Sequence, residues 1–217
     1  MKTKRLLERF ERVYNISDIP RTGTFFVLTM SNSFLGKSIQ GFMRLIQYLH
    51  FTNDTQRIPN HCDVVSEGVA IGALADGVKK HYIADHFNKK AEYFYIIRPV
   101  QIDFKTFKKS WPQAREQTLW NTNIHESVWE FASAQEGEGY KYFDILWHAI
   151  KTVTLKWLGE KEVKESDMKY DRDKWTCYSL GASSYNYAVN DNFFPDPIEI
   201  TPLAFCQIVH DHPNLFT

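Results

Sequence analysis

The sequence has little of several features that mark particular classes of protein. Its 26 Lys and Arg residues are balanced by 26 Asp and Glu residues, so no excess of positive charge favours a nucleic-acid partner. Three cysteines, Cys62, Cys177 and Cys206, are too few and too odd in number for the disulfide framework of a small secreted domain. We therefore interpret all three as thiols and expect no nucleic-acid partner.

Long apolar runs are missing as well. No stretch of about 18 apolar residues occurs, which argues against a membrane-spanning helix. The first residues, MKTKRLLERFERVYN, alternate charged with apolar side chains and lack the continuous apolar stretch of a secretory signal peptide. We expect an amphipathic helix within residues 1–20, and a protein that is cytoplasmic or virion-associated.

The signatures of common metal and nucleotide sites do not occur. There is no Cys-x-x-Cys or His-Glu-x-x-His spacing, and no Gly-x-x-x-x-Gly-Lys or Gly-x-Gly-x-x-Gly run. His210-Asp211-His212 can chelate a metal, although such a polar group near a terminus is more often simply solvated. The expectation is no metal and no cofactor.

What the chain does have is the composition of a globular α+β domain. Its 217 residues, 43% of them apolar and 15% aromatic, suffice for one core, so we expect a single domain over residues 1–217. The apolar patterns predict strands over Thr24 to Thr29, on both sides of a Ser66-Glu67-Gly68 turn within residues 61–71, and over Ala91 to Pro99. Helical patterns cover Ser33 to Leu49, Trp111 to Gln135, Tyr140 to Trp157, Thr176 to Val189 and Leu203 to Val209.

The predicted helix over Thr176 to Val189 places a cysteine where a thiol nucleophile can be activated. Thr176 is a suitable N-cap, and Cys177 follows it in the first turn. The positive end of a helix dipole and the free N–H groups there favour thiolate over thiol. His61, at the start of a predicted strand, can supply the imidazole that accepts and returns the proton.

Several segments in order resemble the permuted branch of the NlpC-type papain-like superfamily, which includes the YiiX-like and lecithin:retinol acyltransferase-like proteins. The similar segments span residues 22–206, and they are RTGTFFVLTMSNSFLGKSIQGFM, NHCDVVSEGVAIGALADGV, AEYFYIIRP, EGYKYFDIL, KWTCYSLGASSYNYA and FPDPIEITPLAF. In this branch the histidine strand precedes the cysteine helix. His61 then matches the family's base, and Cys177 matches its nucleophile.

The resemblance implies an antiparallel sheet packed against helices, with the nucleophile at a helix N-terminus. It also implies a thiol hydrolase that forms an acyl-enzyme on Cys177. The implied substrates are amides or esters, with cell-wall peptides first and lipid acyl esters or amides second. A phage lysis or virion protein, or a cytosolic enzyme that recycles wall fragments, would reach wall peptides without a signal peptide.

Two positions depart from the family pattern. Cys177 is followed by Tyr178 and Ser179, where the family usually has Ser followed by Glu or Gly. More seriously, Gly72 stands where the family often places the glutamate that orients the imidazole, and loss of such a group slows catalysis. A binding or structural protein that has kept the fold and lost the reaction is therefore the main alternative to an enzyme.

Candidates for a third member of the site remain open. Glu67 is the nearest acidic residue, but a solvated turn residue explains it better than a catalytic role does. Asp63 shares a strand face with His61 and can bond to it locally, yet the sequence gives no strong reason to choose it. Tyr142 matches a family tyrosine that can bind the oxyanion, with Tyr140 as an alternative, and either is equally well explained as a core aromatic.

Overall fold

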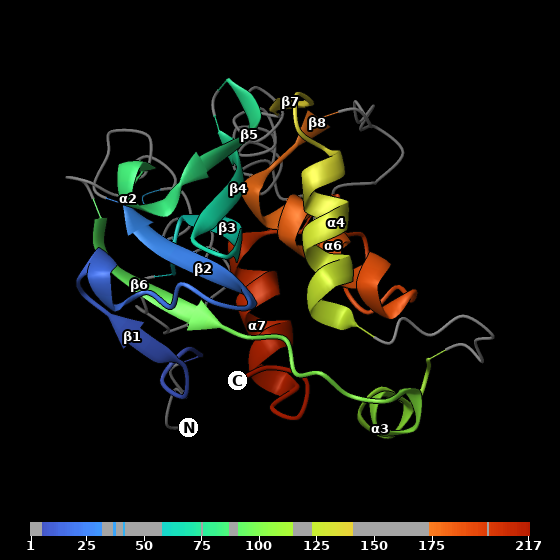
Figure 1. Cartoon of the computed structure of the whole chain (residues 1–217). Coiled ribbons are helices and arrows are strands. Elements are labelled where there is room, and N and C mark those ends of the chain that lie inside the picture. Colours follow the sequence, from blue (N-terminus) through green and yellow to red (C-terminus); the bar gives the residue numbers. More distant parts are fainter. Residues whose placement is uncertain are drawn as a thin grey trace, which may run out of the picture.

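The computed structural model describes residues 6–31, 37, 41, 58–74, 76–86, 91–114, 123–140, 174–198 and 200–217. These residues form a mixed α+β structure in which helices pack against an antiparallel sheet (Figure 1). The strands are β1 (Glu11–Val13), β2 (Thr24–Ser31), β3 (His61–Ser66), β4 (Val69–Leu74), β5 (Gly77–Tyr82), β6 (Ala91–Ile97), β7 (Gly139–Tyr140) and β8 (Lys174–Trp175). The helices are η1 (Ile16–Asp18), α2 (Ile83–His86), α3 (Phe104–Ser110), α4 (Ile124–Ala134), α6 (Cys177–Val189) and α7 (Pro202–Asp211).

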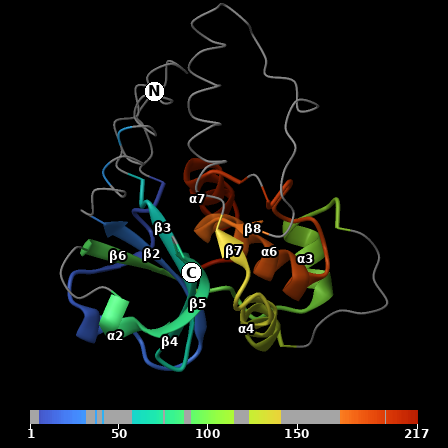
Figure 2. The ribbon, with the colours of Figure 1, turned by 90° about the horizontal axis from the view of Figure 1, so that it is seen from above.

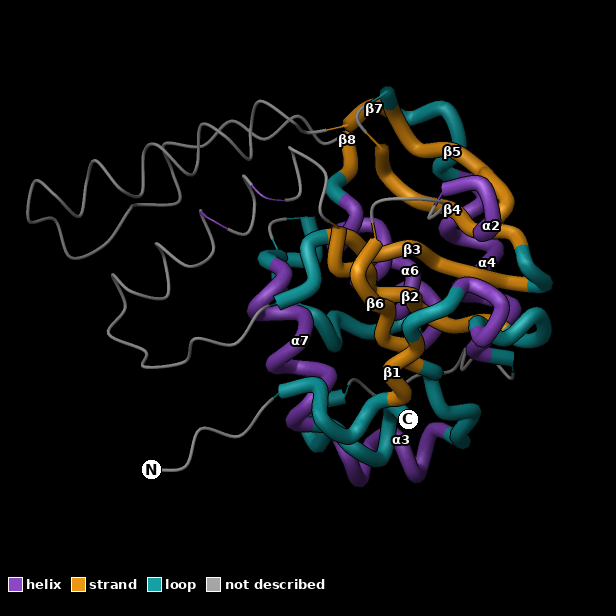
Figure 3. The backbone as a smooth tube through the Cα atoms, turned by 90° about the vertical axis from the view of Figure 1, so that its left-hand side faces the viewer, coloured by secondary structure: helices purple, strands orange, loops and turns teal. Residues whose placement is uncertain are grey.

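The main sheet has six strands in the order β1-β6-β2-β3-β4-β5, and every neighbouring pair is antiparallel. At its far end β7 and β8 form a separate parallel pair that lies beside β5 (Figure 3). Figure 2, seen from above, shows α4, α6 and α7 together on one side of the sheet. The chain therefore brings α6, from its C-terminal part, against strands from its N-terminal half.

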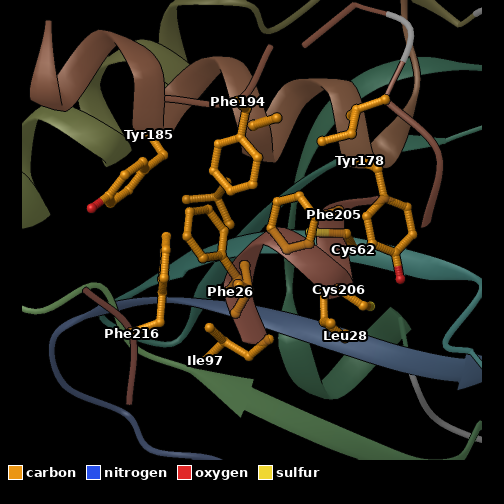
Figure 4. Packing of buried hydrophobic residues seen from close by; sticks show 14 of the residues in the cluster. Phe26, Leu28, Cys62, Ile97, Tyr178, Tyr185, Phe194, Phe205, Cys206 and Phe216 are labelled. Atoms are coloured by element: carbon orange, nitrogen blue, oxygen red, sulfur yellow. The ribbon is translucent and has the colours of Figure 1, made fainter. Parts of the chain in front are cut away.

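The continuous apolar run of β2 reflects burial on both faces of the sheet. Phe26, Leu28 and Met30 enter the large core beneath the helices, whereas Phe25 and Val27 enter a smaller cluster on the opposite face. A strand covered on both sides needs apolar side chains at successive positions rather than at alternate ones. The close view in Figure 4 shows Phe26 and Leu28 facing the aromatic side chains of the helical layer.

The hairpin that carries His61 is the one predicted from the sequence. Glu67 and Gly68 both have positive φ angles, of 51° and 77°, as the two central residues of a type I′ hairpin turn require. This turn fixes the register in which Asp63 pairs with Gly72. The predictions over residues 24–29 and 91–99 are also confirmed, by β2 and β6.

The predicted N-terminal helix is wrong over the residues that the structure describes. Leu6, Leu7 and Phe10 are buried, but they lie in a turn, and residues 11–13 form the edge strand β1. The apolar spacing suits a helix, yet backbone pairing with β6 and the stacking of Arg12 over the Tyr93 ring, 3.8 Å from its centroid, hold the extended form. Local propensity is a weak preference that such tertiary contacts override.

Candidate functional site

The first turn of α6 is built by a capping box. The Thr176 hydroxyl accepts a hydrogen bond from the Ser179 N–H at 3.0 Å, and the Thr176 N–H donates to the Ser179 hydroxyl at 2.7 Å. The Leu180 N–H is bonded to the Thr176 carbonyl. The helix therefore has no acceptor of its own for the N–H groups of Cys177 and Tyr178, which can serve an oxyanion. Thr176 is confirmed as the cap.

His61 and Asp63 lie two residues apart on β3 and share one face of it. The Nε2 atom of His61 lies 2.9 Å from Oδ1 of Asp63. The Asp63 side chain is fully buried, and 16% of the His61 side chain is exposed. A carboxylate shielded from water interacts strongly with a nearby charge, because little solvent screens it. Asp63 therefore orients the imidazole and stabilises its cation.

The imidazole of His61 also forms a hydrogen bond with the thiol of Cys177. Burial, the largest single influence, lowers the pKa of His61, but the Asp63 carboxylate and Cys177 together outweigh it and raise this pKa well above its ordinary value. An imidazole with a raised pKa is a ready proton acceptor for a thiol.

Gly72 leaves the space that the Asp63 carboxylate occupies. It is the cross-strand partner of Asp63, and a Cβ atom at position 72 would lie 1.8 Å from Asp63 Oδ1 and 3.4 Å from His61 Nε2. A larger residue at position 72 and the present conformation of Asp63 are thus mutually exclusive. The acid that the family pattern places on β4 is absent, and another acid reaches the imidazole from β3.

Glu67, the tentative third member, is not brought to His61. It lies in the turn at the far end of β3, and its carboxylate accepts a hydrogen bond from the Gly23 N–H at 3.2 Å. Five strand residues lie between it and His61, so the two backbones are six residue steps apart, which corresponds to about 20 Å. The acidic partner of the imidazole is Asp63, which the sequence offers as a local partner of His61 without a strong reason to choose it. The signal was its spacing of two from His61 on one strand.

The tentative Tyr142 lies outside the described residues. Its alternative, Tyr140, is half-buried in β7, pairs with Trp175 of β8 and packs against the large core. The position of β8 matters to the site, because Trp175 precedes Cys177 by two residues. Pairing of β7 with β8 thus helps to fix where α6 begins.

His210 and His212, which the sequence offers as possible metal ligands, bond to backbone carbonyls. The Nδ1 atoms of His210 and His212 donate to the carbonyls of Leu6 and Ile208 at 2.9 and 2.8 Å. His81 lies near the site, with Nε2 4.0 Å from Asp63 Oδ1. Within the described ranges, no three His, Cys, Asp or Glu side chains are grouped so that they could hold a metal ion.

The remaining two cysteines are packed into the core. Burial raises the pKa of Cys62 well above its ordinary value, and electrostatic interactions with Cys177 and Asp63 add to this effect. Burial likewise raises the pKa of Cys206. Both thiols therefore stay protonated and unreactive near neutral pH. Of the three cysteines, Cys177 is the one placed beside a base.

No family model matches the chain, and no curated protein matches its sequence. In the part of the chain that the structure describes, no helix has both the length and the apolar character needed to cross a membrane. The geometry is therefore the basis for a functional proposal. A thiol at a helix N-terminus, an imidazole bonded to it and a buried carboxylate behind the imidazole can perform nucleophilic attack on a carbonyl group.

Proposed function

We propose that the protein is a thiol hydrolase that cleaves amide or ester bonds, with Cys177 as nucleophile, His61 as base and acid, and Asp63 as the residue that orients His61. The sulfur attacks the substrate carbonyl carbon while His61 takes the thiol proton. The resulting oxyanion accepts hydrogen bonds from the N–H groups at the start of α6. His61 then gives its proton to the leaving amine or alcohol, and a thioester remains on Cys177.

Hydrolysis of the thioester completes the cycle. His61 takes a proton from water, the hydroxide attacks the thioester carbonyl, and the sulfur leaves as the acid product forms. The proton on His61 returns to the sulfur. No cofactor enters either half of this cycle.

One observation carries the proposal: the His61 imidazole is hydrogen-bonded to the Cys177 thiol and, through Nε2, to the buried carboxylate of Asp63. An antiparallel sheet covered by helices, with the cysteine at a helix N-terminus, is also compatible with the permuted papain-like fold that the sequence resembles. Gly72 lacks the carboxylate that the family pattern often has at this position, and this lack favoured an inactive protein. The buried carboxylate of Asp63 can take the place of that missing charge.

The substrate class follows from the resemblance. Cell-wall peptides that contain D-amino acids are the first candidates, and lipid acyl esters or amides the second. A virion-associated lysis protein and a cytoplasmic enzyme that recycles wall fragments are the two settings that suit the first class. Loss of turbidity in a suspension of purified cell walls, set against release of fatty acid from an acyl ester, distinguishes the two substrate classes.

Alkylation tests the proposed chemistry directly. Iodoacetamide labelling between pH 5 and 9, read by mass spectrometry of each cysteine peptide, should give a Cys177 rate at least roughly tenfold above those of Cys62 and Cys206 at neutral pH. At pH values below 8, Cys177 of the His61→Ala variant should be alkylated more slowly than Cys177 of the wild type. Its rate should approach that of an ordinary thiol with a pKa of about 8.5.

His125→Ala is the matched control, because this half-buried histidine bonds to the Thr24 carbonyl at 3.0 Å, at the opposite end of β2 from Thr29, the partner of His61. It should label as wild type does. If Cys177 of the wild type is alkylated as slowly as Cys206, and if its rate is the same in His61→Ala, the hydrolase is the wrong model. A binding or structural protein then becomes the better description.

A further inference from the structure

Tyr178 connects the backbone beside the nucleophile to the backbone beside the base. It directly follows Cys177, and its side chain is almost completely buried. Its hydroxyl donates a hydrogen bond of 2.8 Å to the carbonyl of Pro59, which lies two residues before His61. A single bond thus joins the start of α6 to the start of β3 across 119 positions of sequence.

The acceptor belongs to a segment that is itself fixed. Pro59 and Asn60 are buried, and the Asn60 N–H donates to the Thr29 carbonyl at 3.1 Å, just before His61 pairs with Thr29. A buried carbonyl needs a donor. The Tyr178 hydroxyl supplies one to Pro59, at the point where the chain enters the histidine strand.

The donor is equally well held. The Tyr178 ring meets Phe205 edge to face, with centroids 5.3 Å apart, and Phe205 stacks on Phe194 at 4.9 Å (Figure 4). Burial, with the nearby thiols of Cys206 and Cys62, raises the pKa of Tyr178 well above its ordinary value. The hydroxyl therefore keeps its proton and can donate throughout the working pH range.

These contacts close a ring of chain and hydrogen bonds. The path runs from Cys177 to Tyr178, across to Pro59, along the backbone to His61, and back to Cys177 through the bond between imidazole and thiol. In such a ring the separation of sulfur and imidazole depends on the position of the hydroxyl. A displacement of about 1 Å at reacting groups can lower a rate by about 100-fold.

We propose that Tyr178 is a positioning residue, whose hydrogen bond to Pro59 sets the approach of the Cys177 thiol to the His61 imidazole. The catalytic part of this inference rests on the proposed function. The inference goes further by giving a role to Tyr178, which stands where the family usually has a serine after the nucleophile. It also assigns the role to the hydroxyl alone, since any large aromatic side chain could fill the space.

The test is the removal of that hydroxyl in Tyr178→Phe, compared with Tyr185→Phe. Tyr185 is a matched control: it lies on the same helix, it is fully buried among Phe193, Phe194 and Phe216, and its hydroxyl has no hydrogen-bond partner among the described residues. Two readouts are needed for each variant. One is the NMR titration of the His61 imidazole, and the other is the rate of Cys177 alkylation at neutral pH.

We expect Tyr178→Phe to shift the His61 titration and to slow Cys177 alkylation by about tenfold, while Tyr185→Phe matches the wild type in both. A Tyr178→Phe protein that loses stability yet keeps the wild-type titration and alkylation rate would overturn the proposal. Failure of the proposed function has a different signature. The wild type then shows no hydrolysis and slow Cys177 alkylation, although the His61 titration still distinguishes Tyr178→Phe from Tyr185→Phe.

Discussion

Two neighbouring groups favour the protonated form of the His61 imidazole, the Asp63 carboxylate and Cys177. Its burial acts in the opposite direction, since a charged ring loses hydration. The raised pKa of His61 shows that the two partners outweigh this cost. The proton shared by thiol and imidazole thus depends on the Asp63 carboxylate as well as on the sulfur.

Asp63→Asn tests this dependence with little change of shape. The amide can still bond to the ring, but without the negative charge the pKa of His61 should fall, as NMR titration of the imidazole will show. Hydrolytic activity should drop by roughly 10²-fold or more, because the imidazolium is no longer stabilised.

Glu67→Gln is the control for Asp63→Asn, because it makes the same chemical change in the acid at the far end of β3. It should leave both the titration and the activity unchanged. If the His61 pKa moves in Glu67→Gln and stays in Asp63→Asn, the assignment of the two acids is wrong.

Asp63 could be named from the sequence as a possible partner of His61, but it could not be chosen over the other candidate acids. A spacing of two puts His61 and Asp63 on one face of a strand, but such pairs are common and the i+2 pattern alone does not show contact. The contact between Asp63 and His61 is possible because Gly72, on the neighbouring strand β4, has no side chain to occupy the same space. Gly72 is opposite Asp63 only in the observed register, and that register depends on the Glu67-Gly68 turn.

At the scale of elements, the β3–β4 hairpin is tightly packed where Asp63 pairs with Gly72. A methyl group at position 72 would coincide with the carboxylate of Asp63, 1.8 Å from Oδ1, so one of the two side chains must move. Without Asp63, the same methyl group would meet only ordinary contacts. The effect of a substitution at Gly72 should therefore change sign with the identity of residue 63.

A double-mutant cycle measures that change of sign. Gly72→Ala in the wild type should destabilise the fold by about 1–3 kcal/mol, as an overpacked core position does, and should displace Asp63 from His61. In an Asp63→Ala background it should stabilise by about 0.5–1 kcal/mol, the usual preference for alanine over glycine within a strand. Urea unfolding of the four proteins gives the coupling, and equal effects in both backgrounds would show that the clash does not exist.

Predictability from sequence differed among the elements for physical reasons. Strands β2 and β6, buried on both faces, and helix α6, with its Thr176 cap, have strong local signals, and all three were predicted. Strand β5 (GVKKHY) has no regular alternation of apolar and polar residues, because it forms the edge of the main sheet, and it was missed. Edge strand β1 was predicted as a helix because its pairing with β6 joins segments far apart in sequence.

Helix α3 was also missed, since its signal is short. Asp103 caps it by accepting from the Thr106 N–H at 2.7 Å, but only Phe107 of its seven residues is buried. The long helical pattern predicted over residues 111–135 is confirmed only at Ile124–Ala134, where Asn123 provides the cap. Residues 111–114 form a turn, and residues 115–122 and most of the pattern over 140–157 lie outside the described residues.

At the scale of the whole molecule, the site lies where two distant parts of the chain meet. His61 and Asp63 come from the sheet, and Cys177 comes from a helix that is buried on nearly all sides. The interactions that would activate the thiol also stabilise this contact, because they favour the protonated form of the His61 imidazole in the folded protein. Folding free energy must then depend on pH.

The direction of this dependence follows from the raised pKa of His61. Below its unfolded value of about 6.5 the ring is charged in both states, and the stabilisation is fully present. As pH rises toward the folded-state pKa, the unfolded chain loses this proton first, so the free energy of unfolding should fall with a slope of up to about 1.4 kcal/mol per pH unit.

Chemical denaturation at several pH values between about 6.5 and 8 measures this slope, and Asp63→Asn should flatten it because the variant lowers the folded-state pKa of His61. The window matters: above about pH 8.5 the buried thiols Cys62 and Cys206, whose pKa values burial raises, add a loss of the same sign. A wild-type protein whose stability rises through the lower window, or whose slope Asp63→Asn leaves unchanged, would show that the contact between His61 and Asp63 does not contribute to folding as the geometry requires.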